Sequence, residues 1–229
     1  MLKLIGLEWK KNNILKYVRN AFIMAVILLI FILAAAGELE ADETMLAYGN
    51  SMLKSGIELF TNMCAIIFTS TMLASFIVGA YKNKTMNLMF SYPISRKKIL
   101  LSQMLSVWIF NFAALVLSKV LIYTILVITK KYTHITAANI ALGSGMFYIE
   151  ILVNSAVMVS ISFIGLLVGL KMKSSKATII AGVLIVCFTQ GNIGAYTLLD
   201  NMPFHVTLLI ISAVSALLAL YKLETRDVL

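Results

Sequence analysis

The sequence predicts an all-α, polytopic membrane protein with six transmembrane helices that form one domain over residues 1–229. Hydrophobic residues make up 61% of the chain and charged residues only 13%, with a mean hydropathy of +0.95. A water-soluble fold of this composition would lack enough polar surface to cover its core. Long apolar runs recur along the chain, and basic residues gather between alternate runs. These features are typical of an integral membrane protein.

The apolar runs are long enough, or nearly so, to cross a membrane. A transmembrane helix needs roughly 20 apolar residues to cover about 30 Å of hydrocarbon. Laid end to end, such runs use most of the chain and leave little for a second domain. The expected spans are Val18–Ala36, Ile57–Tyr81, Gln103–Thr129, Met146–Leu170, Ala177–Ala195 and His205–Tyr221.

The basic residues orient these spans, because cytoplasmic loops of membrane proteins carry an excess of Lys and Arg. With the amino terminus inside, fifteen of the nineteen basic residues fall on the cytoplasmic side, whereas Lys54, Lys130 and Lys131 fall outside. Both termini are therefore expected in the cytoplasm. The net charge of +9 sits in short loops beside the membrane, where anionic lipid is a nearer partner than nucleic acid. We expect no nucleic-acid binding.

The segment before the first span has its own pattern. Residues 1–13 place Leu2, Ile5 and Trp9 near one helical face, which predicts a helix lying in the membrane interface. A simple basic flank with a tryptophan anchor is the alternative.

Two loops between the spans also carry signals. Pro93 is acceptable in the first turn of a helix, so the third helix is expected to begin near it, in the cytoplasmic loop. Between the fifth and sixth spans, Gly191, Gly194 and Pro203 interrupt the apolar pattern. Short re-entrant helices in the outer leaflet and a plain external loop both fit this composition.

The chain lacks the motifs of common membrane enzymes. It has no GxxxxGK[ST] phosphate loop, so we expect neither ATP hydrolysis nor a cofactor in this chain itself. It has no HExxH or GxSxG motif, and His134 and His205 lie in different loops, so no metal site and no catalytic residues are expected. Cys64 and Cys187 lie inside apolar runs, where buried free thiols are the simplest interpretation.

Polar residues inside the expected spans are candidates for a substrate path. A cation in the middle of a span costs roughly 2.5–3.5 kcal/mol on insertion scales, so Lys119 needs compensation. Glu150 enters the next span from the same side, and a Lys119–Glu150 pair would either let both helices insert or take part in substrate binding. Asn and Thr side chains are equally explained by polar contacts between packed helices. The candidates are Glu58, Asn62, Thr69, Asn111, Lys119, Glu150 and Asn154.

The segment between the second and third spans, Lys82–Lys98, carries five basic residues and no acidic one. Within it, Thr85, Leu88, Pro93 and Arg96 follow one another at about the spacing found in six-span permeases of ABC exporters. The segment therefore resembles the corresponding loop of the permeases that serve peptide-antibiotic, bacitracin and lantibiotic export and immunity. The acidic residue that commonly precedes the threonine in that family is replaced here by a basic run.

This resemblance implies a transport subunit that is powered from outside the chain. Residues 1–13 would form an elbow helix, and Lys82–Phe90 would form a coupling helix that docks on a separate ABC ATPase subunit, present in two copies that bind ATP and Mg. A second permease, identical or homologous, would complete a dimer. A basic loop that binds only lipid is the alternative. The coupling residues implied are Lys82, Lys84, Thr85, Met86, Leu88, Met89, Phe90, Pro93 and Arg96.

The expected function is thus that of an exporter permease in a bacterial cytoplasmic membrane. Its substrate would be a hydrophobic or amphipathic peptide, with antimicrobial peptides as one candidate, which leaves the cytoplasm or the membrane. A non-transporting scaffold or sensor subunit that holds a cytosolic partner with the same basic loop is the main alternative. A membrane enzyme is a weaker third interpretation.

Overall fold

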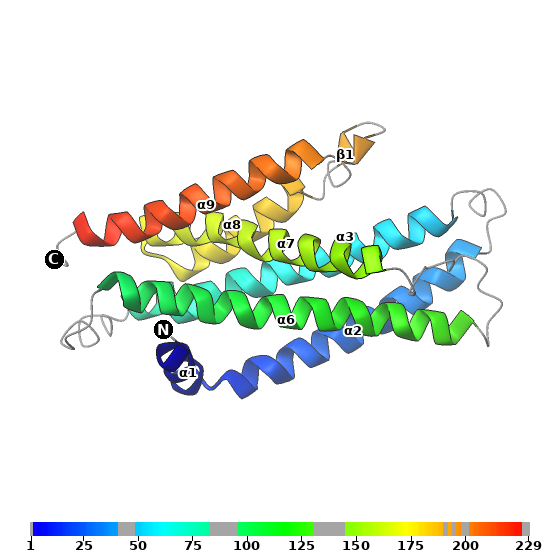
Figure 1. The fold of residues 1–229 in the computed structure, drawn as a ribbon, viewed down its shortest axis with the longest axis horizontal. Coiled ribbons are helices and arrows are strands. Elements are labelled where there is room, and N and C mark those ends of the chain that lie inside the picture. Colours follow the sequence, from blue (N-terminus) through cyan, green and yellow to red (C-terminus); the bar gives the residue numbers. More distant parts are fainter. Residues whose placement is uncertain are drawn as a thin grey trace. The chain divides into compact units, whose positions relative to one another are not determined.

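Helices make up nearly all of the described structure, a computed structural model (Figure 1). It describes residues 2–40, 49–82, 96–130, 145–189, 192–193, 196–197 and 202–225. The elements are α1 (Leu2–Lys11), α2 (Ile14–Glu40), α3 (Gly49–Leu73), the π-helix η1 (Ala74–Val78), α4 (Gly79–Lys82), α6 (Arg96–Lys130), α7 (Gly145–Met172), α8 (Ser175–Thr189), β1 (Asn192–Ile193), β2 (Tyr196–Thr197) and α9 (Met202–Thr225).

Four helical segments are long and apolar enough to cross a membrane: Ile14–Ala35, Lys54–Val78, Lys97–Thr129 and Gly145–Met172. By helix content, length and hydropathy, the chain is therefore an all-α membrane protein. The fifth and sixth expected spans correspond to shorter apolar helices, Ser175–Thr189 and Val206–Tyr221. At 1.5 Å per residue, the fifteen residues of α8 rise by about 22 Å, which is less than the hydrocarbon thickness.

The predicted end of the fifth span is wrong. Residues 192–193 and 196–197 also do not form a re-entrant helix, which is one of the two expectations for the segment between the fifth and sixth spans. Helix α8 ends at Thr189, whereas the prediction continued it to Ala195. The antiparallel pair β1–β2 follows, with Asn192 opposite Thr197 and Ile193 opposite Tyr196. Glycine is a poor helix former, and the sequence places Gly191 and Gly194 after the end of α8.

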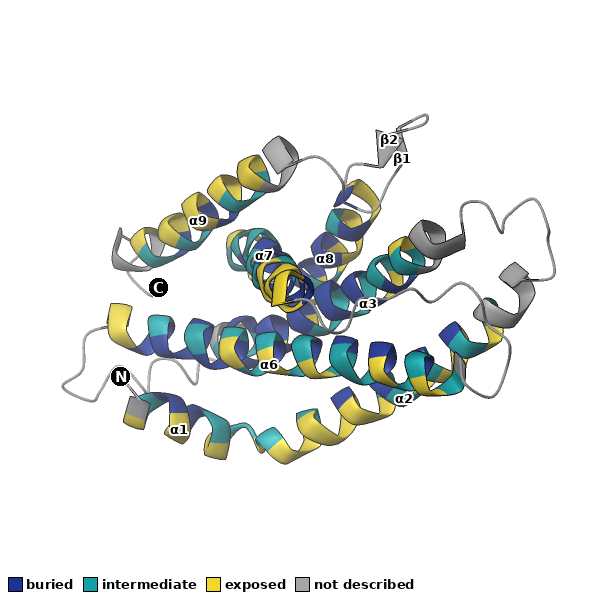
Figure 2. Ribbon diagram, turned by 45° about the vertical axis from the view of Figure 1, so that its right-hand side comes forward, coloured by how far each residue is buried: buried dark blue, intermediate teal, exposed yellow. Residues whose placement is uncertain are grey.

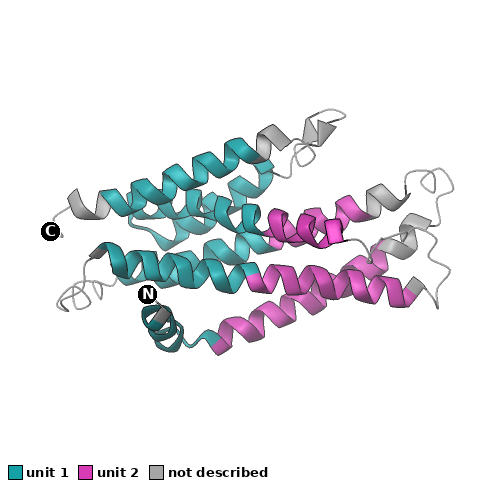
Figure 3. Cartoon of the chain, viewed as in Figure 1, with its two compact units in different colours: residues 1–14, 65–112, 156–229 teal, residues 15–64, 113–155 magenta. Residues whose placement is uncertain are grey.

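The chain divides into two compact units, which Figure 3 colours separately. Unit 1 comprises residues 1–14, 65–112 and 156–229, and unit 2 comprises residues 15–64 and 113–155. Helices α3, α6 and α7 each contribute residues to both units.

Unit 2 has a hydrophobic core between its parts of α2, α3, α6 and α7. Leu28, Ile57, Ile122 and Phe147 are among its buried members. The ring of Tyr123 meets that of Phe147 edge to face, with the ring centroids 5.0 Å apart. One face of α2 remains exposed, as the yellow residues in Figure 2 show. Over residues 22–31 its exposed side chains are large and apolar, which suits contact with lipid.

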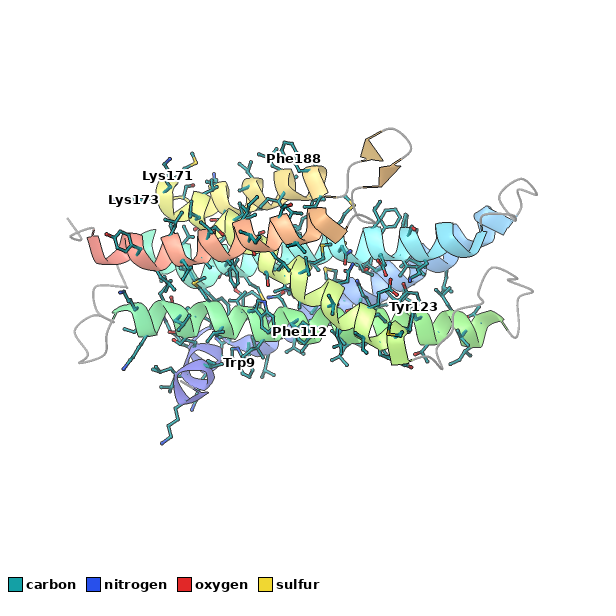
Figure 4. All side chains as sticks on the ribbon, turned by 45° about the horizontal axis from the view of Figure 1, so that its top comes forward. Trp9, Phe112, Tyr123, Lys171, Lys173 and Phe188 are labelled. Atoms are coloured by element: carbon teal, nitrogen blue, oxygen red, sulfur yellow. The ribbon has the colours of Figure 1, made fainter. Side chains whose placement is uncertain are left out.

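Unit 1 contains a tight helical hairpin formed by the later part of α7, from residue 156, and by α8. Lys173, with a φ of 50°, occupies the turn between them. Figure 4 shows Lys171 and Lys173 at this turn and Phe188 toward the other end of α8. Small residues bring the backbones together: a Cβ built on Gly165 would lie 3.3 Å from the carbonyl oxygen of Thr178.

Helix α1 is a separate element, as the sequence predicts, although its position in a membrane interface stays a prediction. Asn13, with a φ of 48°, ends it, because asparagine tolerates the left-handed conformation that stops a helix. The amide nitrogen of Asn13 donates to the Lys10 carbonyl at 3.3 Å. Within unit 1, the indole Nε1 of Trp9 (Figure 4) donates to the Ser106 carbonyl at 3.1 Å and so ties α1 to α6.

Candidate intramembrane polar site

Lys119 of α6 is fully buried in unit 2, within a segment that is long and apolar enough to span a membrane. Its Nζ donates to Oδ1 of Asn154 on α7, at 2.9 Å. Buried lysines are rare unless their charge is compensated, and an amide oxygen neutralises no charge. Lys119 is therefore a costly residue whose ammonium group has two further N–H donors to satisfy.

The expected direct pair between Lys119 and Glu150 is wrong. Both carboxylate oxygens of Glu150 accept hydrogen bonds from Nζ of Lys54, each at 2.9 Å. The side chains of this ion pair are 39% and 52% exposed. Asn154, rather than Glu150, thus makes the direct contact with Lys119.

Several other buried polar groups of unit 2 lack hydrogen-bond partners. The amide Nδ2 and Oδ1 of Asn62, the hydroxyl of Tyr123 and Oγ of Ser155 are buried without a partner among the described residues. Buried polar atoms are almost always hydrogen-bonded, because an unsatisfied one costs about 1–3 kcal/mol. We define Asn62, Lys119, Tyr123, Asn154 and Ser155 as the intramembrane polar site.

Three helices supply this site, and their spacing follows from the helical repeat. Lys119 and Tyr123 are four residues apart on α6, so they share a face. Asn154 and Ser155 are neighbours on α7, and Asn62 lies one turn after Glu58 on α3. Figure 4 labels Tyr123, whose ring belongs to the same unit as Lys119. Of the residues of the site, Lys119 and Asn154 are in direct contact, and the other three are polar residues buried in the same unit.

Four of the expected path residues are not members of this site: Glu58 and Glu150 lie in unit 2 without belonging to it, and two others lie in unit 1. Thr69 and Asn111 belong to unit 1 and are buried there. Oγ1 of Thr69 donates to the Ala65 carbonyl at 2.7 Å, and Nδ2 of Asn111 donates to the Val107 carbonyl at 2.8 Å. Both therefore bond to a carbonyl of their own helix, as polar residues in packed membrane helices often do, and Nδ2 of Asn111 also donates to Sδ of Met72 on α3 at 3.2 Å. The expected stripe from Glu58 to Thr69 is divided between the two units.

Other residues were missed as members or neighbours of the site. The sequence indicates Lys54 only as an outer charge, although it lies four residues before Glu58 and thus on the same helical face. Ser155, next to Asn154, is also unmarked in the sequence, whereas Tyr123 lies four residues after Lys119, on the polar face that helical spacing predicts. In unit 1, Glu8 was not singled out, yet it is buried and its Oε1 accepts from Nε2 of Gln103 at 3.3 Å. A single acidic residue in a basic helix could have indicated that contact.

The expected ATPase-coupling residues fall largely outside the described residues. Lys82 is the last residue of α4 and Arg96 the first of α6, which leaves the expected helix start near Pro93 untested. The remaining residues, which lie outside the described part of the chain, are Lys84, Thr85, Met86, Leu88, Met89, Phe90 and Pro93. Among the described residues, no group of three His, Cys, Asp or Glu side chains could hold a metal ion.

Comparison with known proteins finds one informative similarity. The chain is 24% identical to the uncharacterized protein YcbO of Bacillus subtilis (strain 168), over an alignment of 234 residues that covers 99% of this chain and 100% of that protein. No family model matches the sequence. No solved structure matches either.

Proposed function

We propose that this chain is the transmembrane permease subunit of an ATP-driven ABC exporter. The observation that supports it best is the intramembrane polar site, where a fully buried lysine lies in the same unit as unpaired polar atoms. Such a site is expensive in an apolar helix bundle, and ionisable residues at this depth commonly mark a substrate or ion pathway. A scaffold that only anchors a cytosolic partner has no need of it.

The proposed architecture is the six-span arrangement expected from the sequence. Helices α8 and α9 would complete the four longer spans, with α1 as an elbow helix in the interface and both termini in the cytoplasm. The chain would lie in a bacterial cytoplasmic membrane and pair with an identical or homologous permease. Two ATPase subunits would supply the ATP and Mg sites.

The proposed mechanism couples ATP binding to movement of the spans. The apolar residues of Lys82–Phe90 would seat in a groove of the ATPase, and the basic residues would contact its surface. Closure of the ATPase dimer would then shift α6, which follows this segment, and change access to the polar site. A hydrophobic or amphipathic peptide suits this path, since its backbone amides and charged groups could use the polar site while its apolar side chains stay in lipid.

The test is transport in vesicles that contain this chain and a phosphate-loop ATPase encoded beside it. Lys119→Met, which removes the charge but keeps the length, should abolish peptide-stimulated ATP hydrolysis and peptide export while ATPase binding persists. Lys171→Met is the control, since it removes an exposed lysine and should leave both activities intact. Phe90→Asp should instead release the ATPase from the membrane.

The scaffold interpretation makes the opposite prediction. If the ATPase binds, no peptide of a hydrophobic library stimulates hydrolysis, and Lys119→Met behaves like Lys171→Met, then the transport proposal is wrong. The same protein should retain its partner in that case, because the basic segment would still be intact.

A further inference from the structure

Unit 1 contains an open cavity of about 420 Å³ that the transport proposal does not use. Its walls come from the end of α1, from the region where α3 becomes η1 and α4, and from the start of α8. This volume lies within the usual range of small-molecule sites, roughly 300–1,000 Å³. Space is left because the helix that forms its floor is built from small residues, Ala74, Ser75, Gly79 and Ala80.

The π-helix η1 contributes to this shape. It widens the helix over Ala74–Val78, and the Ala74 carbonyl accepts from the amide of Gly79. Oγ of Ser175, at the start of α8, approaches the same carbonyl at 3.4 Å. Short π segments often occur at functional sites. Here the segment fixes one wall of the cavity to α8.

The residues that line the cavity include both polar or basic side chains and apolar ones. Lys11 and Asn12 contribute an ammonium and an amide, while Phe76 and Ile179 contribute hydrocarbon. The described lining side chains include no carboxylate. The buried carboxylate of Glu8 lies beside both polar residues: its Oε2 is 3.8 Å from Nζ of Lys11 and accepts from Nδ2 of Asn12 at 3.4 Å, and Nδ2 of Asn12 also donates to the Glu8 carbonyl at 3.0 Å. This combination matches a molecule with an anionic head and an apolar tail.

The neighbouring chain positions add positive charge. Lys10 precedes the lining residue Lys11, and Lys173 and Lys176 flank the lining residue Ser175; all three neighbours are exposed. Lysines beside a membrane attract anionic headgroups, at roughly 1 kcal/mol each. Since the chain is a membrane protein, the abundant amphiphile of this kind is a phospholipid.

We propose that this cavity binds the phosphate-bearing headgroup of an anionic phospholipid, with the first part of an acyl chain against Phe76 and Ile179. Lys11 and Asn12 hold the headgroup. The site does not depend on the transport proposal, because it needs neither an ATPase nor a peptide. Bound lipid would bridge α1, the α3–η1–α4 helix and α8 within unit 1.

The test uses the full chain in vesicles of equal parts phosphatidylglycerol and phosphatidylcholine, followed by detergent extraction and native mass spectrometry. The wild-type protein should retain phosphatidylglycerol in preference to phosphatidylcholine. Lys11→Gln should weaken this retention about fivefold, and Ser75→Leu, which fills the cavity from an exposed position, should abolish it. Lys10→Gln is the matched control and should change it little.

Three outcomes would overturn the proposal. Equal losses in Lys10→Gln and Lys11→Gln would indicate general attraction to the basic surface. Unchanged retention in a correctly folded Ser75→Leu protein would remove the cavity from consideration. Displacement of the lipid by millimolar inorganic phosphate would mean that the site binds free phosphate rather than a lipid.

Discussion

In unit 1, several buried polar side chains meet partners across helices, although Oγ of Ser70, Oε1 of Gln103 and Oγ1 of Thr178 are buried without a partner among the described residues. Glu8 accepts from Gln103, Trp9 donates to Ser106, and Nε1 of Trp108 donates to Oγ of Ser160 at 3.1 Å. In unit 2, Lys119 has one amide contact, and Asn62, Tyr123 and Ser155 have unpaired atoms among the described residues. Unit 1 also packs its helices through glycines, whereas unit 2 packs large side chains such as Tyr123 and Phe147.

This contrast separates a structural use of polarity from a functional one. Satisfied polar contacts hold helices together at little net cost. A buried cation with one amide contact lowers stability, and a sequence retains such a group most readily where something else uses it. Both units hold unpaired buried polar atoms, so it is the buried lysine that marks unit 2 as the candidate site of action.

The largest expected effect comes from removing the amide that holds the buried lysine. Asn154→Leu would leave the Lys119 ammonium without its hydrogen bond and should lower the free energy of unfolding by about 3 kcal/mol. Adding Lys119→Met should recover most of this loss, because the unsatisfied charge disappears. Thermal unfolding of the purified chain in lipid nanodiscs measures both changes.

Asn111→Leu in unit 1 is the control for this experiment. It removes hydrogen bonds to the Val107 carbonyl and to Sδ of Met72 but strands no charge, so the expected loss is about 1 kcal/mol. Equal losses at Asn111 and Asn154, with no recovery in the double variant, would show that the two units do not differ in this respect.

A smaller effect is expected from the packing of unit 1. A Cβ on Gly182 would lie 2.6 Å from Cβ of Ser70. Overpacking of this kind costs about 1–3 kcal/mol, which exceeds the gain of about 1 kcal/mol from replacing a helical glycine by alanine. Gly182→Ala should therefore lower the midpoint of thermal unfolding.

Gly56→Ala provides the opposite case in unit 2. Nothing lies within 4 Å of a Cβ built there, so only the helix propensity changes and the midpoint should rise. If both alanine variants shift the midpoint in the same direction, the close approach of α8 to α3 in unit 1 is not as tight as the structure has it.

The sequence predicts helices well where apolar runs define them, and less well where polar residues continue them. The fourth expected span, Met146–Leu170, differs from α7 by one or two residues at each end. Helix α3 instead begins at Gly49, before the apolar run at Ile57, because a helix can extend beyond hydrocarbon at no cost to its backbone hydrogen bonds. The π-helix η1 has no hydropathy signal of its own.

The candidate site was predictable in its central residue but not in its contacts. Lys119 is conspicuous because a cation in an apolar run is costly. The hydrogen-bond partner of Lys119 could not be derived from the sequence. The periodicity of α6 shows which residues share a face with Lys119, but it does not show which face of α7 turns toward them. Glu150 lies one turn from Asn154 on α7, and the structure joins the lysine to the amide. Lys54 from α3 takes the carboxylate instead.

The smallest effect is expected at that outer ion pair, where both side chains are substantially exposed. Exposed pairs contribute about 0.2–1 kcal/mol, and salt screens them, with a Debye length of about 3 Å at 1 M ionic strength. Lys54→Gln and Glu150→Gln should each lower the midpoint of thermal unfolding slightly at low salt, and a double-mutant cycle should give a coupling energy that vanishes at 1 M salt. A large coupling energy that does not change with salt would contradict this, because only a desolvated ion pair escapes screening. The Lys54–Glu150 pair would then be buried from water, as Lys119 is. The salt dependence of the Lys54–Glu150 cycle thus marks where the intramembrane polar site of unit 2 ends.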